Sequence, residues 1–138
     1  MARVDALPDA EALVSYELRT QLSARVYSSL PSSPVYPLIT IKRIGGIPTD
    51  RVRLDRANIQ VEVWGSPGQT TKSTIRDLAD SVRVKLHAME GKVMTTAAGY
   101  PVNGTCTGVT DTLGLAWLPD PVSDADRYIF GVYVFLHA

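Results

Sequence analysis

The stretch from Ala57 to Met89, "ANIQVEVWGSPGQTTKSTIRDLADSVRVKLHAM", contains two different hydrophobic periods. Every second residue from Ala57 to Val63 is apolar, and the residues between them are polar. This period of two predicts a β-strand with one buried and one polar face. From about residue 67 to residue 89 the apolar residues follow helical spacing instead, and Gly91 then favours a stop. The stretch therefore predicts a strand followed by an amphipathic helix.

The connecting segment "GSPGQTTKST" is similar to a phosphate-binding loop only at first glance. Aligning the motif G-x-x-x-x-G-K-[ST] on Lys72 places Ser66 and Thr71 where the motif needs glycines. Their β-carbons would lie where backbone N–H groups must face the phosphates. Ser66 followed by Gln69 is instead a capping box, which favours a helix start. We expect no nucleotide binding here.

The rest of the chain adds a helix and further strands. Residues 8–22 begin with a proline and two acids and place apolar residues on one face, which predicts a helix. We expect one domain over residues 1–138 of the α+β class, with a mainly antiparallel sheet of four to five strands and both helices packed on one face. The expected strands are residues 38–44, 57–64, 105–117 and 127–136.

Several shorter segments carry local signals. Val26 and Tyr27 could form a short strand, and residues 92–104 form a loop or a short hairpin arm. Gly45-Gly46 is expected to end the strand before it, so that "GGIPTDRVRLDR" becomes a long basic loop. Asn103-Gly104 is interpreted as a turn.

Composition limits the classes of function. The 138 residues include 14 basic and 14 acidic side chains, so the formal net charge is zero. A protein that binds nucleic acid by neutralising phosphates needs a basic excess, so this balance argues against that class. No apolar run approaches the length of a membrane-spanning helix, and we expect no membrane partner.

No catalytic or metal-binding constellation emerges. Cys106 has no second cysteine to pair with and is expected to be a small buried side chain. His87 and His137 lack any partner that the sequence establishes, so no triad is predicted. Three aspartates near one turn do not match a calcium-binding loop and favour turn formation: Asp120, Asp124 and Asp126. We therefore expect no enzyme activity, no metal and no cofactor.

Two features point to contacts with other subunits. Arg51, Arg53 and Arg56 lie in the expected basic loop, which is either a solvated connection or an interface arm that pairs with carboxylates. The final strand, "YIFGVYVFL", is apolar on both faces. Its second face, with Tyr133 and Phe135, would be an exposed patch in a monomer. We expect these five residues to lie at a subunit interface or against a partner.

Several segments together resemble a known family. In chain order they are "LPDAEALV", "RVYSSLP", "YPLITIKRIGG", "DRANIQVEVWG", "GLAWLPDP" and "RYIFGVYVFLH". Their order and spacing, over nearly the whole chain, resemble the tail terminator (tail completion) proteins of long-tailed bacteriophages. The segment "GKVMTTAAGYPVNGTC" is longer than the family pattern leads one to expect.

The resemblance implies a structural role in virion assembly. Such proteins form a ring, commonly of six subunits, on the last ring of tail tube subunits, where the ring stops tube growth and offers a surface to the head–tail connector protein. The implied location is the neck of the virion, after assembly in the host cytoplasm. Zero net charge fits a ring through which DNA passes without specific binding. Two alternatives stay open: a head-closure or other minor tail or neck component, and a small cytosolic ligand-binding domain or enzyme.

Overall fold

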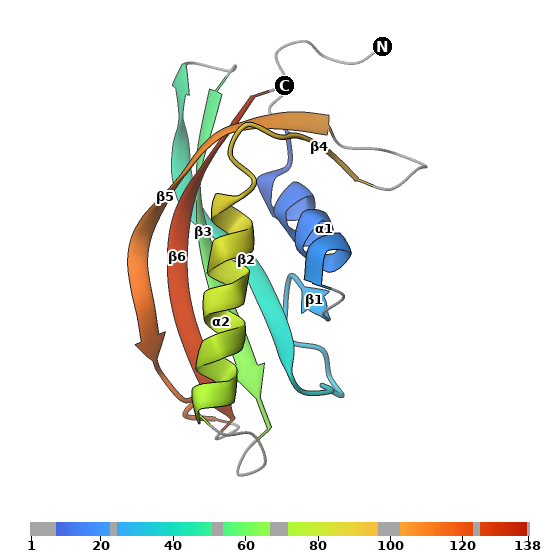
Figure 1. Cartoon of the computed structure of the whole chain (residues 1–138), viewed down its shortest axis with the longest axis vertical. Coiled ribbons are helices and arrows are strands. Elements are labelled where there is room, and N and C mark those ends of the chain that lie inside the picture. The colour runs from blue at the N-terminus through green and yellow to red at the C-terminus, as the bar shows by residue number, and fades with distance from the viewer. Residues whose placement is uncertain are drawn as a thin grey trace.

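The computed structural model confirms the α+β class and shows two helices and six strands in the part of the chain that it describes (Figure 1). It describes residues 8–22, 25–50, 54–66, 72–96, 103–122 and 125–137. In chain order the elements are α1 (Ala10–Leu22), β1 (Val26–Tyr27), β2 (Leu38–Asp50), β3 (Leu54–Gly65), α2 (Lys72–His87), β4 (Val93–Thr95), β5 (Asn103–Trp117) and β6 (Asp126–His137).

The strands form one mixed sheet in the order β1-β2-β3-β6-β5-β4. The expectation of four to five strands was too low, because the short segments β1 and β4 both join the sheet, one at each edge. The four long strands pair with one another in antiparallel fashion, as predicted. β1 runs parallel to β2, because the segment between them brings the chain back to the same end of the sheet before β2 begins.

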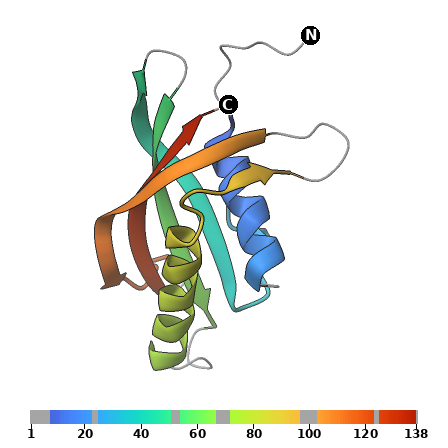
Figure 2. The same ribbon diagram turned by 45° about the horizontal axis from the view of Figure 1, so that its top comes forward.

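The sheet is strongly curled, and both helices lie on its concave side (Figures 1 and 2). The core fills the space between them. Its centre is formed by the inward-facing residues of β3 and β6, which are fully buried against the apolar faces of the helices. Phe130 is among the largest of these side chains, and Val61 lies opposite it on β3. The apolar residues of the alternating pattern in β3 point into this core, and the polar residues between them point to the convex face.

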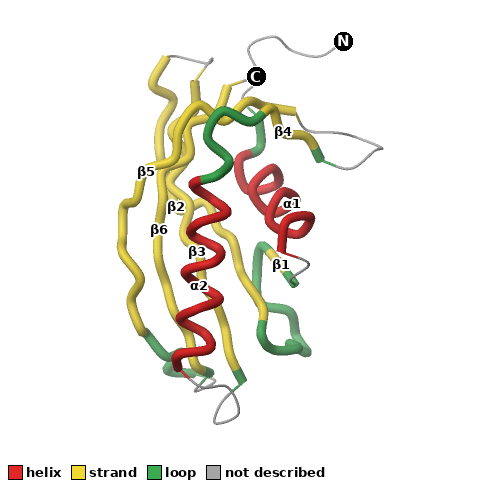
Figure 3. Tube along the Cα trace, in the orientation of Figure 1, coloured by secondary structure: helices red, strands yellow, loops and turns green. Residues whose placement is uncertain are grey.

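The β2–β3 hairpin is longer than the sequence suggested (Figure 3). Gly45-Gly46 does not end β2: the strand passes through a register shift between Arg43 and Gly45 and continues to Asp50. Gly46 has a φ of 96°. The glycines therefore form a β-bulge, in which a residue without a side chain takes a conformation that others avoid. Most of the expected basic loop is strand.

The helix ends follow local chemistry. Asp9 Oδ1 accepts a hydrogen bond from Ala12 N at 3.1 Å, which caps the N-terminus of α1. Gly91 has a φ of 84° and follows α2, as a C-terminal stop requires. The predicted cap of α2 pairs Ser66 with Gln69, which lies outside the described residues.

Asn103-Gly104 is not a turn, contrary to the prediction, but the start of β5, where it pairs with β4. Gly104 is needed for close packing: a β-carbon there would lie 3.0 Å from Leu13 Cδ1 of α1. β5 then pairs with β6 with three register shifts, irregularities of the kind at which a strand bends.

Candidate interaction surface

Three of the five predicted interface residues lie together on the convex face of the sheet. Arg56 is opposite Phe135 in the β3–β6 register, and Asn58 is opposite Tyr133. Because side chains alternate between faces, these four residues all point away from the helices. Ile47 of β2 is opposite Arg56 and extends the same row. We call Ile47, Arg56, Asn58, Tyr133 and Phe135 the outer patch.

Aromatic side chains form the centre of the outer patch. The rings of Tyr133 and Phe135 lie 6.5 Å apart between centroids. The guanidinium carbon of Arg56 lies 4.9 Å from the centroid of the Tyr133 ring, a cation–π contact. Both aromatic residues are partly exposed, and Ile47 is 58% exposed. The outer patch therefore combines exposed apolar and aromatic surface with one cation, Arg56.

Two polar atoms of the outer patch have no hydrogen-bond partner. They are Arg56 Nε and Asn58 Oδ1, and both are shielded from solvent. An unmade hydrogen bond of a buried polar group costs on the order of 1–3 kcal/mol. Such atoms are uncommon in folded domains, and these two lie two residues apart on one face.

In the other half of the convex face, the polar side chains pair with one another. Glu62 is 3% exposed and pairs with Arg127 at 2.8 Å and with Lys42 at 3.6 Å. Trp64 Nε1 donates a hydrogen bond to Thr40 Oγ1 at 3.1 Å. Around Trp64 lies a small second core, completed by Leu38, Ala125, Tyr27 and Tyr36. This end of the convex face has no comparable unsatisfied atoms in the described chain.

The remaining predicted interface residues, Arg51 and Arg53, lie outside the described residues. The hypothesis that they contact a neighbouring subunit or the tail tube stays a prediction.

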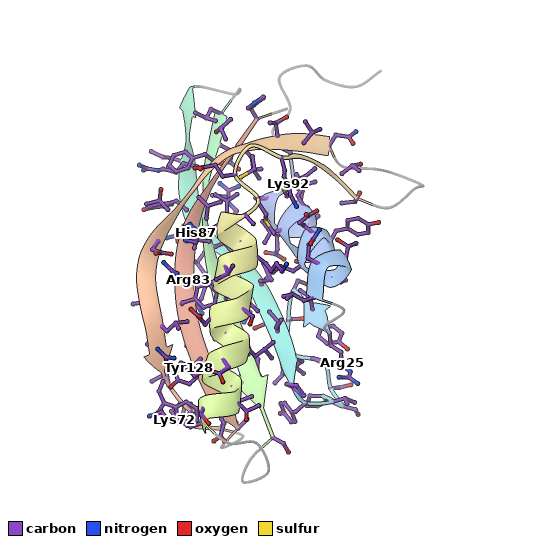
Figure 4. The ribbon with its side chains drawn as sticks, viewed as in Figure 1. Arg25, Lys72, Arg83, His87, Lys92 and Tyr128 are labelled. Carbon is purple, nitrogen blue, oxygen red and sulfur yellow. The ribbon has the colours of Figure 1, made fainter. Side chains whose placement is uncertain are left out.

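The structure also shows a polar cluster that the sequence did not predict. Asp111 of β5 accepts hydrogen bonds from Arg83 Nη2 at 2.5 Å and pairs with His87 Nε2 at 2.8 Å. The hydrogen bond from Arg83 lowers the pKa of Asp111, and His87 lowers it further. Arg83 and His87 lie four residues apart on α2 (Figure 4), but the strand position of their partner is visible only in the fold. The cluster ties α2 to β5.

The candidate metal-binding residues stay apart in the part of the chain that the structure describes. Cys106 is fully buried, and this burial raises the pKa of its thiol, which fits the predicted role as a small core residue. Among the described residues, no three His, Cys, Asp or Glu side chains gather as metal ligands would. The Lys72 ammonium lies 5.1 Å from the Trp117 ring centroid. None of the described helices is long and apolar enough to span a membrane.

The fold is a curled-sheet α+β domain, and the outer patch lies on the convex face of its sheet. Residues 8–100 match the model of the family described as "Tail completion protein gp17". The match covers more than half of the chain, from before α1 to beyond β4. The chain belongs to this family of bacteriophage tail proteins.

One solved structure shares the fold over nearly its whole length. It is a chain of the particle titled "Virion of native gene transfer agent (GTA) particle", with a TM-score of 0.58 and 16% sequence identity. The alignment covers 94% of this chain and 95% of that chain. A search of curated protein sequences gave no match.

Proposed function

We propose that this protein forms a ring, of six subunits, that caps the tail tube of a long-tailed phage or phage-like particle. The ring ends tube polymerisation and provides the surface to which the head connector attaches. The protein acts as a structural part of the virion neck, without enzymatic activity or a cofactor, and assembles in the host cytoplasm. The observation that carries the proposal is membership of the tail completion family over residues 8–100.

The outer patch supports an assembly role. Its exposed isoleucine, its aromatic pair and the unpaired Arg56 resemble the centre of a protein interface, where aromatic residues and arginine are enriched. The fold match to a chain of a virion particle agrees with this role at the level of the fold. The alignment covers 94% of this chain and 95% of that chain, as expected for two domains of the same architecture.

The second candidate is a head-closure or other minor tail or neck component. The two roles differ in what happens when the protein is missing. A terminator limits the length of the tube, so its loss gives tubes of uncontrolled length without heads. A head-closure protein acts on the head side, so its loss leaves tails of normal length.

The first test is to disrupt the gene and supply variants in trans, with tail lengths measured by electron microscopy. We expect overlong headless tails without the protein and normal particles with the wild type. Charge reversal of Arg51 and Arg53 to Glu should leave the fold intact, by circular dichroism, but fail to restore particles. Arg25→Glu is the control, since Figure 4 places Arg25 near β1 and away from the hairpin. Tails of normal length in the absence of the protein would favour the head-closure role instead.

A further inference from the structure

Five consecutive residues in the middle of β5, 110–114, are exposed to solvent. Val109 before them belongs to the core, and Leu115 and Trp117 after them pack against it. The residues between these two points are open on both faces of the strand, and Leu113 is 50% exposed. We call residues 110–114 the β5 arch.

The sheet holds the β5 arch by an interrupted ladder on one side only. Two of the three register shifts between β5 and β6 fall between Asp111 and Ala116. On the other side, β4 pairs with residues 103–105, and within the described residues no strand pairs with the outer edge of the β5 arch. This part of β5 is the outermost strand on the left of Figures 1 and 3. Segments with few ladder contacts and exposed backbone are those that open locally at low free energy.

On the concave side, Asp111 ties the β5 arch to α2. Its Oδ2 accepts a hydrogen bond from Arg83 Nη2 at 2.5 Å, and its Oδ1 pairs with His87 Nε2 at 2.8 Å. The hydrogen bond from Arg83, and then that from His87, lowers the pKa of Asp111, so this carboxylate is charged at neutral pH. Asp80 also acts on Arg83, but Asp111 raises the pKa of Arg83 more.

On the convex side, Thr112 occupies the space that Gly131 of β6 leaves free. Gly131 lies between the core residues Phe130 and Val132, so a β-carbon at this position would point to the convex face. Such a β-carbon would lie 2.6 Å from Thr112 Oγ1 and 3.7 Å from Leu113 Cβ. The first distance is too short for a real contact, so any side chain at position 131 would displace Thr112. The β5 arch therefore has one specific contact on each face of the sheet.

The two ends of β5 are held by separate contacts, which confine any opening to the middle of the strand. Gly91 N donates a hydrogen bond to Cys106 O at 2.7 Å, and Cys106 N donates one to Lys92 O at 2.9 Å. At the other end, the rings of Trp117 and Tyr128 pack edge to face with their centroids 5.2 Å apart. Neither set of contacts involves the β5 arch.

We propose that the β5 arch opens and closes as a unit on the folded domain, and that the contacts of Asp111 and Thr112 hold it closed. The structure shows the closed state. In the open state, the segment between Val109 and Leu115 leaves the edge of the sheet, while β3, β6 and both helices keep their packing. This conformational change is a property of the single chain and does not depend on the proposed function.

The test is hydrogen–deuterium exchange of the purified chain at neutral pH, read by mass spectrometry of its peptides. In the wild type, amides of the β5 arch should exchange faster than those of β3, because they exchange by local opening. Asp111→Ala should speed exchange in the β5 arch at least about threefold, an effect within the range of an exposed ion pair, and leave β3 unchanged. Gly131→Ala should speed the same amides by displacing Thr112, although every ion pair stays in place.

Glu17→Ala is the control, because it removes an ion pair with Lys92 that lies outside the β5 arch. Its exchange in residues 110–114 should equal that of the wild type. Circular dichroism checks the fold of each variant, and Asp111→Asn replaces Asp111→Ala if the alanine variant does not fold. Unchanged exchange in the β5 arch of the Asp111 or Gly131 variant would overturn the proposal. An equal rise in the β5 arch and in β3 would also overturn it, because the opening would then be that of the whole domain.

Discussion

At the residue scale, the pair of Arg43 and Asp55 fixes the base of the β2–β3 hairpin. Asp55 is fully buried on the concave side, and both of its oxygens accept hydrogen bonds from the guanidinium of Arg43. These hydrogen bonds raise the pKa of Arg43. Replacing Asp55 by Ala should lower the free energy of unfolding by about 2–3 kcal/mol, because a partly buried cation loses its partner.

Urea unfolding of Asp55→Ala tests this, with Glu17→Ala as the matched control. Glu17 pairs with Lys92 at 3.0 Å, and Lys92 is 43% exposed, so its loss should cost no more than about 1 kcal/mol. Equal losses for the two variants would show that Asp55 contributes no more than a surface pair.

Some features of single residues could be predicted from the sequence, and others could not. The burial of Cys106 and the placement of Tyr133 and Phe135 on the second face of β6 followed from alternation and composition, and the structure agrees. The pairing of Asp111 with Arg83 and His87 did not, because it joins residues more than twenty positions apart. The lack of hydrogen-bond partners for Arg56 Nε and Asn58 Oδ1 could not be predicted either, because it depends on side-chain positions.

At the element scale, the bulge at Gly45-Gly46 decides how far the β2–β3 hairpin extends. A β-carbon at Gly46 would lie 1.9 Å from Arg56 O and 2.8 Å from Asn58 N, and the φ of 96° is itself unfavourable for other residues. Gly46→Ala should therefore lower the free energy of unfolding by about 2 kcal/mol or more. It should also disturb the outer patch, because the clash falls on β3 beneath it.

The control for this prediction is Gly114→Ala on β5. No atom lies within 4 Å of a β-carbon built at Gly114, so its unfolding free energy should change by no more than about 0.5 kcal/mol. Urea unfolding of both variants gives the comparison. A loss at Gly46 as small as that at Gly114 would mean that the hairpin adapts without the bulge.

The bulge at Gly45-Gly46 also explains why the end of β2 could not be predicted from the sequence. A pair of glycines after a β-branched run looks the same whether the strand ends or bulges, and only pairing with β3 distinguishes the two. The prediction of a turn at Asn103-Gly104 was wrong for a similar reason, because close packing on α1 and a turn both favour glycine. The long elements α2 and β3 were predictable because each buries one face, so that apolar residues recur at helical spacing in α2 and at every second position in β3.

At the scale of the whole molecule, the order of elements was predictable and the shape of the sheet was not. The α+β class and the antiparallel pairing of the long strands followed from the pattern. The parallel edge strand β1 and the strong curl depend on how distant segments meet.

The central claim is that this chain closes a ring on the end of the tail tube, and the most direct measurement is an electron microscopy map of the neck of assembled particles. The account predicts six copies of this fold in one closed ring, stacked on the last tube ring and in contact with the head connector. A map that places the chain at the tail tip, within the head, or nowhere in the finished particle would contradict the account.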